Sequence, residues 1–554
     1  MSRKSLATVA LVSLGCPKNL VDSERMLAGL ALGGFAVTTD ADGADVAVVN
    51  TCAFLDLSRA ESDQHLDALE TLKRRGRLGR IVVAGCMAQR YGRQVLQRHP
   101  GVDAVVGLAG RDELAGICRR VLAGRRAGER GRSNAARQRA AGRETRRAKY
   151  HPVRGGSPNP PRKARSAPAA LVSVGPHAAA PPDDRERLRL TPRHYAYLRI
   201  SEGCDNRCAY CAIPEIRGPL RSKPPGQVLA EAEELAADGA KELILIAQDT
   251  TAYGRDFAAD DGHLAAGLAP RAGAIADCEL RIADLKKRSA TNPAHVSLPA
   301  VQSAIRNPQS AMEPGAASLA HLLGVLRERV RVRWLRLMYT HPASFTEDVI
   351  GQLGVRPLVP YVDLPLQHAS DAILESMGRR TGRAEIESLI ARLRAAAPGI
   401  AIRTSFIVGY PGETDARFEE LLGFVEKVRF DHVGVFVYSA EAGTRAAGLP
   451  DQVPAAVARE RWERLMQAAE RLAFAAAEAR RGQVLEVLVD GAEESGRLVA
   501  RHAGQAPEVD GVVLLAPGTA ATGQFVQVRI TGAEGYDLVG EVEDSSKFQV
   551  PSSK

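Results

Sequence analysis

The chain has 554 residues, of which 45% are hydrophobic and 25% charged, and its formal net charge is +9. Its length exceeds that of one domain, and its composition excludes a chain that is disordered throughout. Eight cysteines, isolated or in one tight cluster, exclude a secreted disulfide framework, and no apolar run is long enough to cross a bilayer, so we expect a cytoplasmic protein without membrane segments.

Three short β-branched runs in residues 1–118 each end at a cysteine. "LATVALVSLG" precedes Cys16, "DVAVVNT" precedes Cys52 and "RIVVAG" precedes Cys86, and helix-like sequence follows each run. This alternation predicts an open parallel α/β domain in which the three cysteines lie just beyond the carboxyl ends of strands. Sheets of this kind bind ligands at that edge.

The positive charge is confined to the next segment. Residues 119–170 contain 16 Lys or Arg and 2 Asp or Glu, an excess of 14 that leaves the rest of the chain at −5. Arg, Ala, Gly and Pro dominate this stretch, and they cannot build a core. We therefore predict a basic low-complexity linker over residues 119–190.

Six strand-like runs separated by helical sequence recur between residues 191 and 480. They cover residues 195–200, 241–247, 332–338, 360–366, 400–408 and 431–438. The pattern predicts a partial (β/α)6 barrel with its chemistry at the carboxyl ends of the strands. An irregular stretch at about 258–316 resembles a loop insertion, and residues 452–480 predict a long amphipathic helix.

Residues 481–549 contain short strand-like runs with glycine turns, such as "GQVLEVLVDG" and "GVVLLAPG". They predict a small antiparallel β-barrel. Residues 481–548 hold five Lys or Arg and eleven Asp or Glu, a net charge of −6. A domain that reads RNA needs cations to neutralise phosphates, so an acidic barrel suits a basic protein partner better.

The stretch "CDNRCAYC" places Cys204, Cys208 and Cys211 in one loop, directly after the first predicted barrel strand. Three thiols at this spacing indicate a metal site. Zinc is one candidate, but a structural zinc site is closed by four ligands, no fourth cysteine is nearby, and His194 precedes the strand. A four-iron cluster held by three thiolates keeps one iron open for a substrate or cofactor, and this is the site we predict.

This spacing, with Tyr210 just before the last cysteine, resembles the radical S-adenosylmethionine (SAM) enzymes. The resemblance implies a 4Fe-4S cluster on Cys204, Cys208 and Cys211 whose open iron binds SAM. Reductive cleavage of SAM would then give a 5′-deoxyadenosyl radical that takes a hydrogen atom from an unactivated C–H bond. The three cysteines would be catalytic as well as metal ligands, and a low-potential protein such as flavodoxin would supply the electron.

The motifs "SLGCPKNLVDSE", "NTCAF" and "AGCMAQR" resemble the amino-terminal domain of the methylthiotransferases, a family of radical SAM enzymes. In that family this domain is followed by a radical SAM barrel and a terminal β-barrel called TRAM. The resemblance implies that Cys16, Cys52 and Cys86 hold a second 4Fe-4S cluster, whose open iron carries the sulfur to be donated. Isolated cysteines are more often core residues, but three at equivalent strand ends favour a shared site. Cys118 and Cys278 match no family motif, and we expect no role for them in the chemistry.

Further SAM contacts follow from the resemblance of "IAQDTTAYG", "LPLQHAS" and "RTSFIVGYPGET" to family motifs. With Tyr210, they are Gln248, Gln367, Arg403 and Gly409. Gly409 follows a strand, where a missing side chain lets the backbone approach a ligand. For any single one of these residues, a turn or a loop cap is an equally good interpretation.

Two branches of the family differ in substrate. One modifies an adenosine of transfer RNA, and the other modifies the β-carbon of an aspartate in the twelfth small-subunit ribosomal protein. "SLGCPKNLVDSE" resembles the second branch, since the transfer RNA branch reads closer to "GCQMN" there, and the acidic terminal barrel favours the same substrate. We therefore predict a monomeric methylthiotransferase that acts on this ribosomal protein, on or near the small subunit, and uses one SAM for the methyl group and one for the radical.

Two other functions stay open from the sequence. A transfer RNA adenosine methylthiotransferase would share all the cofactors and differ only in substrate. A non-catalytic protein with structural zinc sites could instead use the arginine-rich linker as an RNA-binding arm. Metal and sulfide analysis separates the second alternative, and a substrate assay separates the first.

Overall fold

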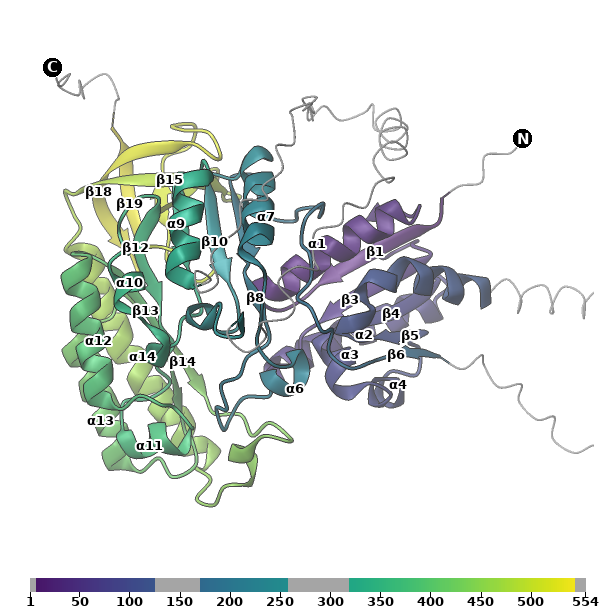
Figure 1. Cartoon of the computed structure of the whole chain (residues 1–554), viewed down its shortest axis with the longest axis horizontal. Coiled ribbons are helices and arrows are strands. Elements are labelled where there is room, and N and C mark those ends of the chain that lie inside the picture. The colour runs from purple at the N-terminus through teal and green to yellow at the C-terminus, as the bar shows by residue number, and fades with distance from the viewer. Residues whose placement is uncertain (1–5, 125–169, 258–317, 544–554) are drawn as a thin grey trace, which may run out of the picture.

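The computed structural model describes residues 6–124, 170–257 and 318–543, which form three bodies (Figure 1). An amino-terminal α/β domain in purple and blue lies beside a larger body in teal and green, and a small barrel in yellow lies at one end of the larger body. Most of the predicted linker, the insertion at about 258–316 and Cys278 lie outside the described residues.

The amino-terminal domain is built on a six-stranded, fully parallel sheet in the order β2-β1-β3-β4-β5-β6. Its strands are β1 (Thr8–Ser13), β2 (Ala36–Thr38), β3 (Val46–Thr51), β4 (Arg80–Gly85), β5 (Ala104–Val106) and β6 (Leu171–Ser173). Its helices are α1 (Pro17–Leu32), α2 (Asp56–Arg74), α3 (Cys86–Tyr91), α4 (Gln94–Arg98) and the 3-10 helix η1 (Leu108–Glu113).

Both faces of this sheet are buried, which explains the continuous apolar runs in the sequence. Val46 and Val48 of β3 pack on one face with Met26 and Leu30 of α1. Alternate residues such as Val49 pack on the other face with α2 and α3. The predicted parallel α/β domain is therefore confirmed.

The sixth strand, β6, lies inside the stretch that composition assigned to the linker. It pairs in parallel with β5, with Leu171 opposite Ala104 and Ser173 opposite Val106. The run "LVS" is apolar and β-branched, but it is too short to stand out beside the low-complexity sequence that precedes it. The end of the predicted linker is also structured, because Asp184 is buried against the larger body.

The larger body contains the six predicted strands in sequence order, all parallel. They are β7 (Tyr195–Arg199), β10 (Glu242–Ile246), β11 (Trp334–Leu337), β12 (Leu358–Asp363), β13 (Ala401–Val408) and β14 (His432–Val437). The described strands β7 and β14 are edges of this sheet and do not pair with each other, so the barrel is open, as predicted. A short hairpin follows β7, formed by β8 (Ser201–Glu202) and β9 (Arg221–Ser222).

Helices cover the outer face of this open barrel (Figure 1). The α-helices of this body are α6 (Ile213–Arg217), α7 (Pro225–Ala237), α9 (Leu319–Arg329), α10 (Glu347–Ile350), α11 (Asp371–Ser376), α12 (Arg383–Ala396), α13 (Asp415–Val428) and α14 (Ala455–Glu478). Of these, α6 packs against α3 of the amino-terminal domain. The 3-10 helices are η2 (Thr250–Ala252), η4 (Pro342–Ser344) and η5 (Arg445–Gly448). The long helix predicted over 452–480 is confirmed as α14.

The inner face of the open barrel is covered by the other two bodies. Tyr197, Ile244 and Tyr361 point to this face, where they form one apolar cluster with Val21 of α1 and with Leu488 of the carboxy-terminal barrel. The two neighbouring domains therefore cover the concave face of the sheet. The carboxyl ends of its strands meet the amino-terminal domain.

The carboxy-terminal body is a closed five-stranded barrel in the order β15-β16-β17-β19-β18. Its strands are β15 (Val484–Ala492), β16 (Leu498–His502), β17 (Val513–Leu515), β18 (Phe525–Glu534) and β19 (Asp537–Val542). One pair departs from the predicted antiparallel arrangement, since β17 and β19 run parallel. A closed ring with an odd number of strands cannot alternate in direction all the way round, so one parallel pair is required.

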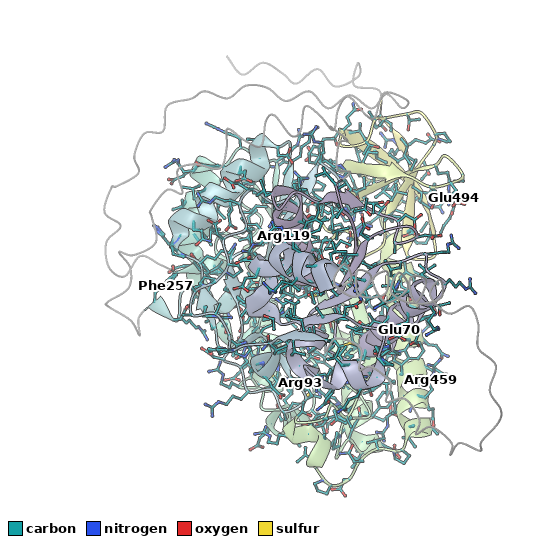
Figure 2. All side chains as sticks on the ribbon, turned by 90° about the vertical axis from the view of Figure 1, so that its right-hand side faces the viewer. Glu70, Arg93, Arg119, Phe257, Arg459 and Glu494 are labelled. Atoms are coloured by element: carbon teal, nitrogen blue, oxygen red, sulfur yellow. The ribbon has the colours of Figure 1, made fainter. Side chains whose placement is uncertain are left out.

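Buried charges attach this small barrel to the amino end of the open barrel. Glu242 of β10 is fully buried, and it accepts from Arg336 at 2.7 Å and pairs with Arg501 of β16 at 2.9 Å. His194 bonds to Asp490 of β15 at 2.8 Å. Figure 2, turned by 90°, shows the amino-terminal domain in front and the small barrel, labelled at Glu494, at the upper right.

Among the described helices, none combines the length and the apolar character needed to cross a membrane.

Candidate functional site

The first cysteine triad lies along one edge of the amino-terminal sheet. Cys16, Cys52 and Cys86 directly follow the neighbouring strands β1, β3 and β4, as predicted. Asn19 ties these strand ends together, because its side-chain amide donates to Leu14 O at 2.6 Å and to the carbonyl of the residue before Cys52 at 3.2 Å. The fold therefore brings together three cysteines that are far apart in the sequence.

The second triad lies on the loop between β8 and α6. The backbone N–H of Cys204 donates to Gly218 O at 3.1 Å, and that of Cys211 donates to Cys208 O at 3.1 Å. The N–H of Ile213 donates to Cys211 Sγ at 3.4 Å. Local hydrogen bonds thus fix this loop at the carboxyl end of β7, where the sequence predicted it.

Glycines with positive φ precede three of the six cysteines, and the sequence analysis missed them. The φ angles of Gly15, Gly85 and Gly203 are +89°, +90° and +79°. A Cβ on Gly15 would lie 2.7 Å from the Cβ of Cys52, and one on Gly203 would clash with the backbone carbonyl of Pro219. The dipeptide Gly-Cys, present at all three positions, is the signal that could have identified these glycines.

Burial raises the pKa values of Cys52, Cys86, Cys204 and Cys211. The pKa of Cys86 rises to about 12, that of Cys211 to about 12 and that of Cys204 to about 11, in each case first because of desolvation. Neighbouring thiols of the same triad raise these values further, which reflects how close the sulfurs are. A cation that binds thiolates is therefore needed to hold either triad in its deprotonated form.

The spacing of the sulfurs argues against a single zinc ion. Among the described residues, Asp67, Glu70 and His99, on and near α2, are the trio whose ligand atoms lie within 4.8 Å of one another. The sulfurs of each cysteine triad are therefore spread more widely, whereas thiolates at the Zn–S distance of about 2.3 Å would lie about 4 Å apart. This spread is compatible with a group wider than one zinc ion, such as a four-iron cluster. His194 bonds to Asp490 at the other end of the barrel, so it does not complete a zinc site with the loop cysteines.

One arginine links the two triads. Arg217 ends α6, the helix that follows Cys211, and its Nη2 lies 3.5 Å from Cys86 Sγ. The same guanidinium donates to Glu202 Oε1 at 2.7 Å and to Asp22 Oδ2 at 3.1 Å. The loop of the second triad therefore reaches the thiol of the first, although neither sequence motif predicts this contact.

Arg217 belongs to a buried group of charges between the two domains, which we call the interface network. Arg199 of β7 donates to Asp22 of α1 at 2.6 Å, to Asp184 at 2.6 Å and to Glu202 at 2.8 Å. Burial alone would raise the pKa of Asp22, but the surrounding arginines outweigh burial and hold it well below its ordinary value. The interface network therefore stays charged and joins the amino-terminal domain to the barrel.

The second triad has an arginine of its own. Arg379 Nη1 lies 3.9 Å from Cys208 Sγ, and Nη2 donates to Pro365 O at 2.6 Å. Tyr210 is close to this guanidinium and to Cys208, and burial raises its pKa well above the ordinary value. The phenol is therefore neutral beside the predicted cluster.

The two glutamines predicted as SAM contacts both lie at the carboxyl ends of the barrel strands, the mouth of the barrel. Gln248 follows β10, and its buried Oε1 has no hydrogen-bond partner among the described residues. Gln367 follows β12 with a φ of +74°, a backbone strain that often accompanies functional positions. Both positions suit a ligand at the mouth, and their contact with SAM stays a prediction.

The other two predicted contacts have protein partners. Arg403 of β13 bonds to Asp363 at 3.0 Å and pairs with Asp510 of the small barrel at 3.3 Å. A Cβ on Gly409 would clash with Ala458 of α14, so the missing side chain serves helix packing. Gly409 therefore allows the close approach of α14, and its contact with SAM stays a prediction.

Lys18 is a residue of the mouth that the sequence analysis did not single out. It lies in the first turn of α1, two residues after Cys16, and its side chain is 8% exposed. Its Nζ donates to Ala247 O, at the end of β10, at 3.2 Å and lies 3.1 Å from the ring centre of Tyr339, which follows β11. Burial lowers the pKa of Lys18 to about 8, although the nearby Cys16 opposes this shift.

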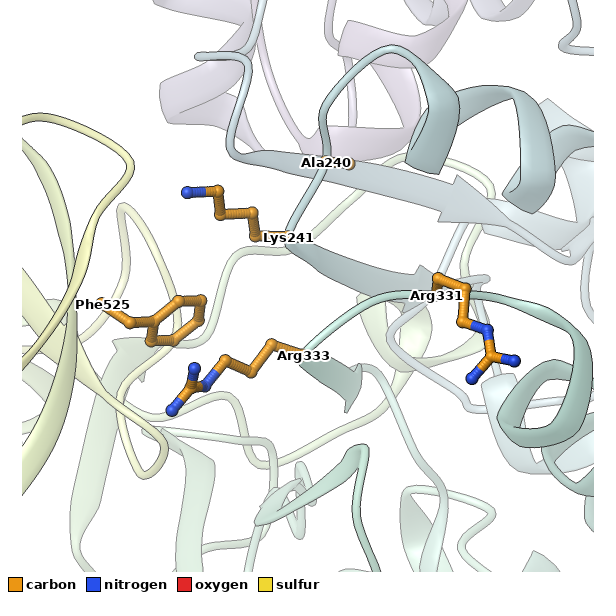
Figure 3. A pocket seen from close by; sticks show the side chains of 5 residues that line it. All are labelled: Ala240, Lys241, Arg331, Arg333 and Phe525. Carbon is orange, nitrogen blue, oxygen red and sulfur yellow. The ribbon is translucent and has the colours of Figure 1, made fainter.

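One cavity formed by described residues lies away from the mouth. It has a volume of about 390 Å³ and is lined by Ala240, Lys241, Arg331, Arg333 and Phe525 (Figure 3). These residues lie at the amino ends of β10 and β11 and on the small barrel, at the opposite end from the cysteines. Cys118 is also remote from the triads, buried in the core beside α1, as expected.

Three domain descriptions match the chain in the order that the sequence predicted. Residues 8–107 match "Uncharacterized protein family UPF0004", residues 198–282 and 317–425 match the radical SAM superfamily, and residues 482–542 match the TRAM domain. Both cysteine triads fall within the first two regions.

Two relatives align along nearly the whole chain. The ribosomal protein uS12 methylthiotransferase RimO of Anaeromyxobacter sp. (strain K) is 38% identical over 540 residues, which cover 96% of this chain and 93% of that protein. The protein of the same name from Citrifermentans bemidjiense is 37% identical, with 98% of this chain and 100% of that protein covered. A solved structure of the radical SAM methyltransferase TsrM from Kitasatospora setae is 14% identical, with 84% of this chain and 89% of that chain covered and a TM-score of 0.43.

Proposed function

The chain belongs to the ribosomal protein uS12 methylthiotransferase RimO family, and from this premise we propose that it adds a methylthio group to the β-carbon of an aspartate of uS12. The observation that carries the proposal is the meeting of two three-cysteine groups at the carboxyl ends of two parallel sheets. Arg217 connects them, since it follows one group in the sequence and contacts Cys86 of the other at 3.5 Å.

Each triad would hold one 4Fe-4S cluster through three thiolates. The cluster on Cys204, Cys208 and Cys211 would bind and reductively cleave SAM, and the cluster on Cys16, Cys52 and Cys86 would carry the sulfur. The protein itself holds the strand ends of the first set through the side chain of Asn19 and the loop of the second set through backbone hydrogen bonds. Arg217 and Arg379 place a positive charge beside one sulfur of each set.

The surface of the small barrel supports a protein substrate over transfer RNA. Of its five Lys or Arg, Arg501 is buried and Lys547 lies outside the described residues. The remaining three arginines are each paired with a carboxylate: Arg481 with Glu478, Arg497 with Glu493 and Glu534, and Arg529 with Glu543. Each of these three arginines therefore has a carboxylate beside it and is poorly suited to bind a phosphate. The acidic barrel would instead attract a basic ribosomal protein.

We further infer a cytoplasmic enzyme that acts as a monomer and takes its electron from a low-potential protein such as flavodoxin. The seven described cysteines are all free thiols, which suits a reducing compartment.

The test is a competition between the two substrate classes. The enzyme is reconstituted anaerobically with iron and sulfide and is given SAM, a reductant, uS12 and transfer RNA in one reaction, and the products are read by mass spectrometry. We expect a methylthio adduct on an aspartate of uS12. An adduct on adenosine would overturn the substrate and keep the chemistry, and zinc without sulfide in the purified protein would overturn both.

A further inference from the structure

Two lysines are buried among the described residues, and their surroundings differ sharply. Lys223 donates to Asp184 at 2.7 Å and to Glu231 at 2.5 Å, so its charge is neutralised inside the protein. Lys18 is 92% buried but has no carboxylate of a described residue within 4 Å of its Nζ. Burying an ammonium with no carboxylate beside it lowers the stability of the fold. Such a group is retained where a ligand supplies the negative charge.

Lys18 also has unused hydrogen-bonding capacity. An ammonium carries three N–H donors. The described residues supply one oxygen acceptor, Ala247 O, and the face of the Tyr339 ring. The φ of Tyr339 is +60°, a strained conformation for a tyrosine that holds its ring against Lys18. One donor is therefore left for an anionic ligand.

The position of Lys18 is at the meeting point of the two domains. It lies two residues after Cys16, and it reaches the ends of β10 and β11 at the mouth of the barrel. It is in the first turn of a 16-residue helix that has no acidic residue in that turn, so the helix dipole adds to its positive potential. A carboxylate that enters between the triads meets this charge.

We propose that Lys18 binds the side-chain carboxylate of the substrate aspartate and so selects an aspartate over an uncharged group at the same site. This inference rests on the proposed function. The carbon to be modified is bonded directly to that carboxyl group, so a cation that fixes the carboxylate also fixes the reacting carbon.

The other cations of this region are occupied. Arg199 and Arg217 bond to carboxylates of the interface network, and Arg403 pairs with Asp363 and Asp510. Arg379 lies against Cys208 Sγ. Among the described buried cations of the mouth, Lys18 is thus the one with neither a carboxylate within 4 Å nor a thiol of the second triad beside it.

The experiment compares binding of two forms of uS12 to the full-length reconstituted enzyme. One form is natural uS12, and in the other the aspartate that acquires the adduct is replaced by asparagine. We expect wild-type enzyme to bind the aspartate form about 10- to 100-fold more tightly, as for a hydrogen bond between two charged groups. In Lys18→Met this preference shrinks to about twofold or less, and in Lys18→Arg it persists. Lys427→Met, on the exposed face of α13, keeps the wild-type preference.

A second measurement separates substrate binding from a structural role. Lys18→Met removes a buried charge that has no carboxylate of a described residue within 4 Å, so its melting temperature is unchanged or higher, and its iron and sulfide contents equal those of wild type. Lys223→Met leaves Asp184 and Glu231 unpaired, and its melting temperature falls. A fall for Lys18→Met equal to that of Lys223→Met, or a preference for aspartate that survives in Lys18→Met, overturns the assignment of Lys18 alone. If wild-type enzyme forms no adduct on uS12, the proposed function and this inference fail together.

Discussion

Cys204, Cys208 and Cys211 lie within eight residues of a single loop, whereas Cys16, Cys52 and Cys86 lie at the ends of three different strands. The loop triad is held by hydrogen bonds between close neighbours in the sequence. The strand-end triad exists only when β1, β3 and β4 have paired, so binding of a cluster there is coupled to folding of the whole amino-terminal domain. Equal sets of thiols can thus differ in how much of the protein they depend on.

The surroundings of the strand-end triad also involve more of the protein than those of the loop triad. The arginine beside the strand-end triad, Arg217, also bonds to two buried carboxylates from two domains. The arginine beside the loop triad, Arg379, bonds to one backbone carbonyl. Changes near the strand-end triad should therefore spread to the domain interface, and changes near the loop triad should stay local.

The largest expected effects come from removing either set of thiols, which tests whether the strand-end triad is tied to more of the protein than the loop triad. We expect Cys16→Ala, Cys52→Ala and Cys86→Ala combined to lose about half of the iron and sulfide, and the triple variant of Cys204, Cys208 and Cys211 to lose the other half. Both make no methylthio product, but only the first still cleaves SAM. The first also melts at a lower temperature, because cluster binding stabilises its domain.

Iron and sulfide analysis, SAM cleavage and thermal unfolding check these outcomes. Cys118→Ala serves as the control, since this thiol lies in the core away from both triads. Loss of all iron from either triple variant would mean that the two sites do not fill independently.

The two arginines give the next largest difference. Arg217→Met leaves Asp22 and Glu202 buried with less compensation, which costs about 3–5 kcal/mol in free energy of unfolding. Arg379→Met removes one bond to a carbonyl and one contact with a sulfur, which costs about 1–2 kcal/mol. Urea unfolding of the two variants measures both values, and equal losses would contradict the idea that only the strand-end triad is tied to the interface.

Much of this arrangement could be predicted from the sequence, because it depends on local patterns. The six barrel strands and the strand ends of Cys16, Cys52 and Cys86 follow from apolar runs of at least four residues. Strands β2, β5 and β6 have three residues each, too few for a period to be recognised. The open barrel and the small closed barrel were expected, but not the parallel pair in the latter.

The charges around the site could not be predicted, because their partners are far apart in the chain. Asp22 and Arg217 are separated by almost two hundred positions, and the sequence around Arg217, "IPEIRGPL", gives no indication of this partner. Lys18 and Tyr339 meet only when two domains dock. Sequence patterns thus identify the thiols of this site, and tertiary structure decides what surrounds them.

The glycines before the cysteines offer a smaller test of the same comparison. Both Gly15→Ala and Gly203→Ala place an alanine at positive φ, which costs about 1–2 kcal/mol in stability. At Gly15 the new methyl group would meet the side chain of Cys52, so we expect loss of iron from the strand-end triad. At Gly203 it would meet the backbone carbonyl of Pro219, and we expect loss of iron from the loop triad.

Electron paramagnetic resonance of the two reduced clusters distinguishes these results, because each variant should lose one signal and keep the other. Gly29→Ala is a suitable control, since a Cβ at this helical glycine meets no atom within 4 Å. If both variants lose the same signal, the two glycines do not act on separate sites.

The smallest expected effect is the loss of stability at acid pH when carboxylates of the interface network, which supports the strand-end triad, are protonated. Burial alone would raise the pKa of Asp184, but Arg199 and Lys223 outweigh burial and hold it well below its ordinary value of 3.8. Since the folded pKa is the lower one, this carboxylate stabilises the fold fully above pH 3.8, and the contribution is lost as the pH falls through the folded value. The free energy of unfolding should therefore decline below about pH 4, by about 1.4 kcal/mol per pH unit for each such group.

Asp184→Asn cannot bind this proton, so its decline, measured by urea unfolding from pH 7 to pH 3, should be shallower by that amount. An unchanged slope would mean that the charge of Asp184 is not what joins the two domains, and the strand-end triad would then be as locally supported as the loop triad.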